Sequence, residues 1–336
     1  MGWFTLHNPM TKTLTKSQAR RLWIHAQKLD LKEPFGSGPK ATQAAIEHLG
    51  YVQIDTINVI ERCHHHILFN RIPKYKKHDL HQAQTKEKSI FEYWTHALSY
   101  VPTKDFRFFM NNMKRIQGSP GKWLAQVKKE ELQRVLRLIK KDGALSIRDI
   151  EDETLVEKAH EWASRKPSKK ALQLGFFSGR LVISERVGML KKYELTERHF
   201  DWTKKPKAAS ESEILEYLLE RALRSQAIVS LDSICHLDPK RKAGIKMLIE
   251  GKIKKHELIQ VQIKEIEKVS HWMRPDITLQ KSESQLTHIL SPFDPLIIQR
   301  KRLNFFFDYN HIFEAYVPKD KRKFGYFTLP VLIGDQ

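Results

Sequence analysis

The stretch KALQLGFFSGRLVISERVGMLKKYELT, from Lys170 to Thr196, decides the fold. Its beginning has the pattern of an amphipathic helix, and Gly179 follows where a helix C-cap is expected. Two strand-like runs come next, on either side of a turn at Gly188. The stretch therefore predicts a helix followed by a two-stranded hairpin.

The same pattern of a Lys-Ala start, a helix, a glycine and a strand occurs twice more. The other copies are KATQAAIEHLGYVQID, from Lys40, and KAGIKMLIEGKIKKHE, from Lys242. Gly50 and Gly251 are the expected helix C-caps of these copies. A helix precedes each copy, and its expected N-cap residue and partner are Thr15 with Gln18, Ser146 with Asp149, and Ser210 with Glu213.

Helices followed by a two-stranded wing are typical of the winged helix, a helix-turn-helix variant whose third helix can enter a major groove. We expect a mainly α fold with small β wings. The expected domains are winged helices at 1–115, 116–200 and 208–280, and a β-rich C-terminal domain at 281–336. The segment HFDWTKKPKAASES, His199 to Ser212, is predicted to be a linker. From Gln285 onward, aromatic and β-branched residues predict strands, and the final LPVLIGDQ predicts a strand with no partner after it.

The composition favours a partner that is a polyanion. The 336 residues include 59 Lys and Arg against 39 Asp and Glu, which gives a net charge of +20. Short basic clusters such as PKYKK, KPSKK and DKRK are spread along the chain, as a long nucleic-acid footprint requires. The alternative is a basic surface kept for solubility.

The remaining global features predict a cytoplasmic protein. No apolar run has the length of a membrane span, and the N-terminus lacks the apolar core of a signal peptide. Cys63 and Cys235 provide no disulfide framework and no zinc spacing. A reducing compartment is the simplest explanation.

The stretch GYVQID places Gln53 and Asp55 two residues apart in an apolar strand pattern, so both side chains are expected on one face. The following TINVIERCHHHILFNR is compatible with a helix, which would put Asp55 at a strand-to-helix junction. One interpretation is that Asp55 or Thr56 is an N-cap. The other is that a fixed carboxylate beside an amide holds a water and stabilises an oxocarbenium-like sugar cation.

Two further motifs leave alternatives open. His64 to His66 are adjacent, whereas metal ligands on a helix need i, i+3 or i+4 spacing, so no metal is expected. Two interpretations of the histidines remain open. Either His64 or His66 contacts DNA, or one histidine packs in a core and the others face solvent. In FEYWTHALSYVP, Glu92 and His96 stand at i, i+4, and this segment is either core or a Glu–His pair that borders a site. GSGPK at Gly36 lacks the residues of a P-loop.

Together, GYVQIDTINVIERCHHHILFNR, FEYWTHALSYVP, KPSKKALQLGFFSGRLVISERVGMLKKYELTER and LSPFDPLIIQRKR…FGYFTLPVLIGD resemble the bacterial winged-helix DNA glycosylases of the AlkZ/YcaQ type. The resemblance runs from about Leu14 to Asp335. It implies three tandem winged helices closed by a β-barrel-like domain. It also implies excision of N7-alkylated purines from duplex DNA and unhooking of interstrand crosslinks.

The family's catalytic motif of Gln, an apolar residue, then Gln or Asp falls on Gln53, Ile54 and Asp55, which implies the Gln-x-Asp branch. Water would be the nucleophile, without a metal or other cofactor. The implied partner is double-stranded DNA, bound by a monomer associated with the nucleoid. Because members of this family continue beyond LPVLIGD, the C-terminal sheet is expected to be incomplete. The candidate DNA contacts are His64, His66, Lys169, Lys170, Arg180, Lys191, Lys192, Lys240, Arg241 and Lys242.

Two non-catalytic alternatives remain at this level. One is a winged-helix transcription regulator, which would bind specific sequences as a dimer. The other is a nucleoid or RNA-binding protein that uses charge alone. Both predict that Asp55→Asn leaves function intact, whereas a glycosylase would lose cleavage and keep binding.

Overall fold

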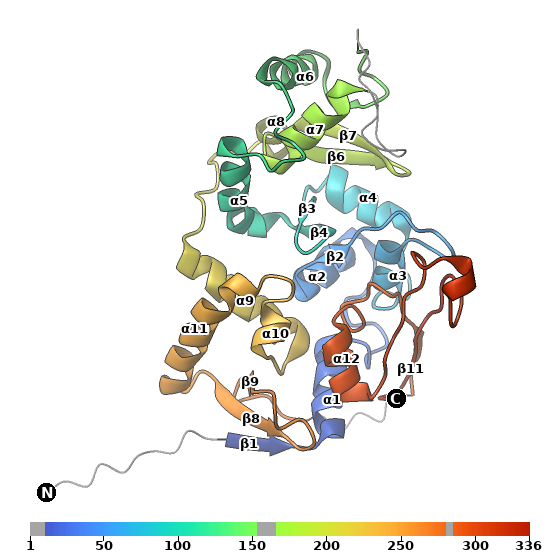
Figure 1. The fold of residues 1–336 in the computed structure, drawn as a ribbon, viewed down its shortest axis with the longest axis vertical. Coiled ribbons are helices and arrows are strands. Elements are labelled where there is room, and N and C mark those ends of the chain that lie inside the picture. Colours follow the sequence, from blue (N-terminus) through green and yellow to red (C-terminus); the bar gives the residue numbers. More distant parts are fainter. Residues whose placement is uncertain (1–10, 153–165, 280–284) are drawn as a thin grey trace, which may run out of the picture. The chain divides into compact units, whose positions relative to one another are not determined.

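The computed structural model describes residues 11–152, 166–279 and 285–336. The chain forms two compact units, in which helices are combined with small sheets (Figure 1). Unit 1 comprises residues 1–37, 47–75 and 211–336, and unit 2 comprises 38–46 and 76–210. Helix α2 (Gly38–Leu49) crosses one boundary between them.

Unit 1 begins with β1 (Thr11–Leu14) and α1 (Lys16–Ala26). The predicted capping box at Thr15 is confirmed. Thr15 Oγ1 accepts the N–H of Gln18 at 3.1 Å, and Gln18 Oε1 accepts the N–H of Thr15 at 2.8 Å. Gly50 follows α2 with φ +81°, as a C-cap requires, and a Cβ there would collide with the Arg221 side chain. Short β2 (Val52–Gln53) and α3 (Cys63–Phe69) come next.

The later part of unit 1 follows the predicted order of helices and a strand pair. Its elements are α9 (Glu211–Gln226), α10 (Leu231–Ile234), η2 (Pro239–Arg241), α11 (Lys242–Lys254), β8 (Ile259–Ile263) and β9 (His271–Met273). Strand β8 lies between β1, which is parallel to it, and β9, which is antiparallel. Helix α9 begins directly after Ser210, as predicted. The prediction for Gly251 was wrong, because α11 continues to Lys254 and His256 takes the left-handed conformation instead.

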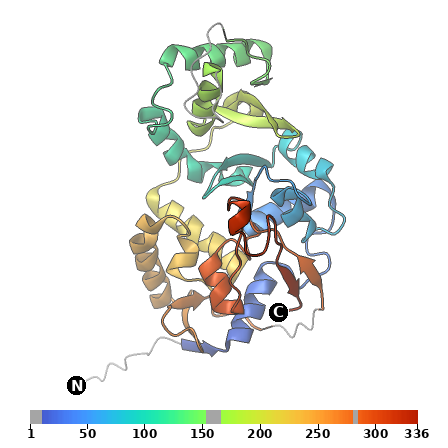
Figure 2. The ribbon, with the colours of Figure 1, turned by 45° about the vertical axis from the view of Figure 1, so that its right-hand side comes forward.

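The C-terminal segment of unit 1 is less β-rich than predicted. It contains β10 (Thr287–Ile289), α12 (Arg300–Phe307), η3 (Lys319–Lys321) and β11 (Val331–Ile333). The strand expected in LPVLIGDQ is confirmed as β11, and its antiparallel partner β10 precedes it in the chain. Residues 300–307 form a helix rather than a strand because Leu303 and Phe306 share its buried face. Helix α12 lies beside α1 (Figure 2), where the rings of Trp23 and Phe306 are 5.4 Å apart.

Among its helices, the described part of unit 2 contains a β-hairpin and a three-stranded sheet. Its elements are α4 (Lys77–Thr85), β3 (Ile90–Trp94), β4 (Leu98–Pro102), η1 (Thr103–Asp105), α5 (Phe106–Gly118), α6 (Lys129–Asp142), β5 (Leu145–Ser146), α7 (Pro167–Phe177), β6 (Leu181–Val187), β7 (Leu190–Leu195) and α8 (Thr196–Phe200). The predicted helix and hairpin are confirmed as α7 and the antiparallel β6–β7 pair. At Ser146 the expected local bonds are present, since its N–H and hydroxyl both donate to the Asp149 carboxylate, at 2.7 and 2.8 Å. The prediction that Ser146 is a helix N-cap was wrong, because Ser146 belongs to β5 and residues 147–152 form no helix.

The predicted linker is packed rather than free. Within His199–Ser212, Phe200 belongs to α8 and stacks on Trp202 at 4.5 Å between ring centroids, and Trp202 also contacts Phe106. The N–H of Ala209 donates to the carbonyl of Arg107 at 3.2 Å. Only residues 201–210 lack helix and strand, and aromatic packing holds part of them against α5.

The segment FEYWTHALSYVP forms the β3–β4 hairpin with Phe91, Glu92 and Tyr93 buried, so of the two alternatives the core is confirmed. The i, i+4 spacing of Glu92 and His96 lies in a hairpin and not in a helix. Such spacing brings side chains together on a helix and not on a strand. Glu92 is buried and pairs with both nitrogens of the Arg186 fork, each at 2.6 Å, while Gln84 donates to the same carboxylate at 3.2 Å. This buried pair ties the hairpin to β6.

None of the helices in the described ranges is both long and apolar enough to span a lipid bilayer.

Candidate active site

The segment that carries Gln53 and Asp55 leaves the core of unit 1 at Asp55. Val52 and Ile54 are buried, and the Gln53 side chain is only 6% exposed. Strand β2 ends at Gln53, and Asp55 is the first partly exposed residue after it. The carboxylate is therefore the more accessible of the two groups.

Asp55 does not cap a helix. Residues 54–62 form a loop, and α3 starts only at Cys63, with Arg62 at its N-cap position and no side-chain cap bond. The N-cap interpretation of Asp55 and Thr56 was therefore wrong. Asp55 Oδ1 instead accepts the N–H of Ile57 at 2.8 Å, an Asx turn that fixes the carboxylate within its own loop.

The two ends of this loop are joined at Cys63. The Cys63 thiol donates to the carbonyl of Gln53 at 3.1 Å, and the side chain is buried. Burial raises the pKa of this thiol, and the negative charge of Asp55 raises it further. Cys63 consequently stays a neutral thiol, which holds the loop through its hydrogen bond and does not act as a nucleophile.

The three histidines differ in their surroundings, although the ring centroids of His64 and His65 are 4.3 Å apart. His64 is buried, in agreement with the alternative that one of them packs in a core. His65 Nδ1 is 2.7 Å from the Tyr75 hydroxyl, and His66 Nε2 donates to the carbonyl of Ile289 at 2.8 Å. The three rings therefore do not converge on one point. In the described ranges no group of three or more His, Cys, Asp and Glu side chains is placed to hold a metal ion.

A second segment of unit 1 lies near Asp55, and the sequence interpretation missed it. The side chain of Tyr316 is 74% exposed, and its pKa is raised by partial burial and by the charge of Asp55. Phe324 and Tyr326 are exposed on the same segment. The density of aromatic and basic residues in FEAYVPKDKRKFGYF was the available signal, but we read it as strands.

One carboxylate holds this aromatic segment in shape. Glu314 accepts the N–H groups of Lys323 at 2.5 Å, Phe324 at 2.7 Å and Gly325 at 3.1 Å, and these bonds lower its pKa. The Arg322 guanidinium lies 5.0 Å from the Tyr326 ring centre. The exposed rings therefore belong to a fixed loop.

Two groups on which the charge of Asp55 acts are neutral. The raised pKa values of Cys63 and Tyr316 keep both groups protonated at neutral pH. An accessible carboxylate in this setting can stabilise a nearby positive charge and can accept a proton from a water molecule.

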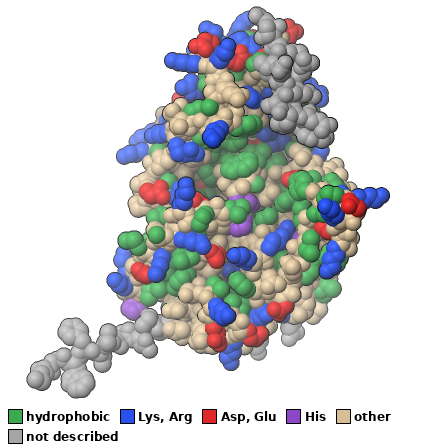
Figure 3. All heavy atoms as spheres, in the orientation of Figure 1, with side chains coloured by type: hydrophobic (Ala, Val, Ile, Leu, Met, Phe, Trp, Pro, Cys, Tyr) green, Lys and Arg blue, Asp and Glu red, His purple; other side chains and the backbone are tan. Residues whose placement is uncertain are grey.

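The candidate DNA contacts differ in how freely they are presented. Lys169, Arg180 and Lys240 are exposed. The other five basic candidates are engaged by the protein: Lys170 donates to Gln126, Lys191 lies over Phe176, Lys192 pairs with Glu185, Arg241 pairs with Asp238 and Glu211, and Lys242 pairs with Asp232. Figure 3 shows Lys and Arg side chains scattered over the visible face instead of gathered in one patch.

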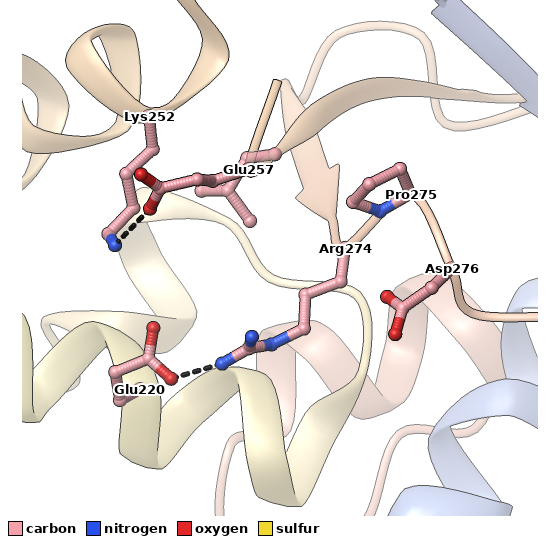
Figure 4. Close-up of a pocket in the computed structure, with 7 residues that line it drawn as sticks. Glu220, Lys252, Glu257, Arg274, Pro275 and Asp276 are labelled. Atoms are coloured by element: carbon pink, nitrogen blue, oxygen red, sulfur yellow. Dashed lines mark hydrogen bonds and ion pairs between the residues drawn. The ribbon is translucent and has the colours of Figure 1, made fainter. Parts of the chain in front are cut away.

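Two cavities of unit 1 lie elsewhere. A cavity of about 210 Å³ is lined by charged residues from α9, α11 and the β8–β9 region (Figure 4). Its charges are largely matched within the protein, since Lys252 pairs with Glu257 at 2.8 Å and Arg274 pairs with Glu220. A neighbouring cavity of about 470 Å³ includes His48 and Arg224. Neither is lined by Gln53 or Asp55.

Comparison with known proteins identifies the class. A model of the DNA glycosylase AlkZ-like family matches residues 46–336, and the chain belongs to this family. The fold is similar to that of the Streptomyces sahachiroi DNA glycosylase AlkZ, with a TM-score of 0.59 and 13% identity over 96% of this chain and 86% of that one. The protein is a DNA glycosylase, as the sequence predicted, and this assignment favours an enzyme over both non-catalytic alternatives.

Proposed function

We propose that this DNA glycosylase hydrolyses the N-glycosidic bond of N7-alkylated purines in duplex DNA and unhooks interstrand crosslinks, as a Gln-x-Asp enzyme. The observation that carries the proposal is the position of Asp55. It is a partly exposed carboxylate, fixed by the Ile57 N–H, beside groups that stay neutral.

The chemistry of the leaving group explains why one carboxylate is sufficient. An N7-alkylguanine carries a positive charge and departs without protonation by a general acid. The enzyme must stabilise the sugar cation that remains and deliver water to it. Asp55 supplies the negative charge and takes the proton of the water, and Gln53 orients that water. No step needs a metal or another cofactor.

The proposed fold places DNA along several winged helices. Two sets of elements in the described chain combine helices with a strand pair that follows them. The first set is α6, β5, α7 and β6–β7, and the second is α9, α10, α11 and β8–β9. These two element orders support the proposed winged helices at 116–200 and 208–280, and the proposal adds a first winged helix at 1–115 and a C-terminal domain at 281–336. The proposed enzyme is a monomer associated with the nucleoid.

Binding should depend mainly on phosphate contacts. Lys169, Arg180 and Lys240 are proposed as the foremost contacts because they are exposed. Affinity would then be salt-sensitive and largely independent of sequence. A crosslinked base cannot rotate fully out of the helix, so for that lesion the site would act on a base still held near the stack.

The test uses a duplex with one N7-methylguanine and a second duplex with an N7 interstrand crosslink. Each is incubated with wild type, Asp55→Asn and the control Asp276→Asn, which removes one exposed carboxylate from the same unit. Alkali then reveals abasic sites. We expect cleavage by wild type and Asp276→Asn, and a loss of about 100-fold or more for Asp55→Asn with DNA binding retained. Equal cleavage by all three proteins would overturn the role of Asp55. No cleavage of either duplex by wild type would overturn the proposed substrates.

A further inference from the structure

The loop that begins at Asp55 presents two apolar side chains to solvent. Ile60 is 67% exposed and Val59 is 51% exposed, and the chain bends at residues 59–61. Thr56 and Asn58 beside them are also exposed, so the pair forms an apolar tip on a polar loop. Keeping two adjacent apolar side chains in water costs free energy, and a partner that covers them would remove that cost.

Both ends of this loop are fastened. The bond from the Cys63 thiol to the carbonyl of Gln53 closes the loop, and the Asx turn of Asp55 stiffens its first residues. The loop therefore has the form of a compact Ω-loop, whose ends are close and whose tip projects. A fixed tip can be inserted into a partner at a low entropic cost.

The tip is close to the proposed chemistry. Ile60 lies five positions after Asp55, which limits their backbone separation to about 17 Å even in a fully extended chain. This span is only a few base pairs, since a base pair rises about 3.4 Å. An apolar tip so near the attacked bond would meet the base stack beside the lesion.

We propose that Val59 and Ile60 form an apolar wedge that enters the DNA base stack next to the damaged nucleotide, and this inference rests on the proposed role of Asp55. Apolar side chains that enter base steps unstack and kink the duplex. The wedge would expose the sugar of the lesion to Asp55 without full rotation of the base, as a crosslinked base requires. The tip is thus a positioning element that contributes no group to the reaction.

The first test reports unstacking independently of cleavage. A duplex carries 2-aminopurine beside N7-methylguanine, and fluorescence is measured at saturating protein in the Asp55→Asn background. We expect binding of Asp55→Asn to raise the 2-aminopurine fluorescence. The rise should be about five-fold smaller for the double variant Asp55→Asn with Ile60→Ala. Asp55→Asn with Ile333→Ala is the matched control, since Ile333 is 53% exposed on β11 of the same unit. Ile60→Leu should restore the signal.

The second test measures single-turnover excision. In a fully paired duplex, Ile60→Ala is expected to slow excision about ten-fold or more, because unstacking is then unassisted. With a mismatched base opposite the lesion, the loss should shrink to about three-fold or less, because that step is already weakened. The wedge would be overturned if Ile60→Ala left the fluorescence unchanged. It would also be overturned if Ile60→Ala slowed excision equally on the paired and the mismatched duplex. Either result would point to a protein partner for the tip. If Asp55→Asn still cleaves, the proposed role of Asp55 fails, while the fluorescence comparison of wild type with Ile60→Ala still decides the wedge.

Discussion

The thiol of Cys63 donates a 3.1 Å hydrogen bond to the carbonyl oxygen of Gln53, and this bond joins the two ends of the loop that carries Asp55. Ten positions separate the two residues in the chain. The position of the candidate carboxylate therefore depends on a contact that local sequence does not encode.

Removing the hydrogen bond from the Cys63 thiol should affect the rate of excision more than the free energy of unfolding. Cys63→Ala removes a buried thiol and its bond, which should lower the free energy of unfolding by about 1–2 kcal/mol. Because a small displacement of Asp55 weakens its hold on the sugar cation, excision should fall about ten-fold. Cys235→Ala is the control, since Cys235 is also buried in unit 1 but belongs to another core cluster. Single-turnover rates and urea unfolding check both values, and equal rates for the two variants would contradict the role of the bond.

The buried pair of Glu92 and Arg186 should dominate the stability of unit 2. Glu92→Gln leaves a buried guanidinium without its counter-charge, which should cost about 3 kcal/mol. Glu197→Gln removes a carboxylate from an exposed pair with Lys205 and should change stability by less than about 1 kcal/mol. Thermal unfolding followed by circular dichroism compares the two. Similar melting temperatures for both variants would show that the buried pair is not needed.

Stability should fall as the pH drops below neutrality. Burial lowers the pKa of His199 and of His271 from 6.5 to about 4. Between these two pH values the histidine is protonated in the unfolded chain and neutral in the native state. The free energy of unfolding therefore decreases as pH falls from about 6.5 towards 4. Each histidine should contribute on the order of 1–2 kcal/mol of that loss between pH 7 and 5. Urea midpoints at the two pH values test this, and His271→Phe should flatten the dependence if the substitution leaves the protein folded. A wild type with equal midpoints at both pH values would refute the assignment.

Exposed cations should matter more for DNA affinity than cations already paired within the protein. Lys169→Ala and Arg180→Ala should each weaken binding to any duplex and lower the salt slope by about 1. Lys242→Ala should have a smaller effect, because Lys242 pairs with Asp232 in the free protein. Binding isotherms at several salt concentrations check the difference. Identical slopes for all three variants would mean that the native ion pairs exchange freely for phosphate.

Much of the local structure could be predicted from residues close together in the chain. The Thr15 capping box, the C-cap at Gly50 and the β6–β7 hairpin about Gly188 follow from side-chain bonds and backbone preferences that span a few residues. The GYVQID stretch also supplied the candidate site because its motif is contiguous, and the role of Gln53 and Asp55 stays a prediction.

Errors arose where a distant contact decided the outcome. The run TINVIERCHHHILFNR was interpreted as compatible with a helix from Thr56, yet residues 56–62 belong to a loop that the Cys63 bond closes and the helix begins only at Cys63. Residues 300–307 were expected in strands, yet packing of Phe306 against Trp23 favours a helix. The alternative of a Glu92–His96 pair rested on helical spacing, whereas the partner of Glu92 is Arg186, which lies 94 residues away.

The sequence by itself determined the basic character of this protein, which is a property of composition, and it indicated the class through the resemblance of its motifs to a family that the family model then showed. It also contains the Gln53 and Asp55 motif as a run of contiguous residues. Only the tertiary structure decided that Asp55 follows a buried strand rather than caps a helix, that its charge acts on Tyr316 and that Ile60 is exposed on the same loop. The physical reason is that burial and charge around a side chain come from residues far away in the chain, and only folding brings those residues together.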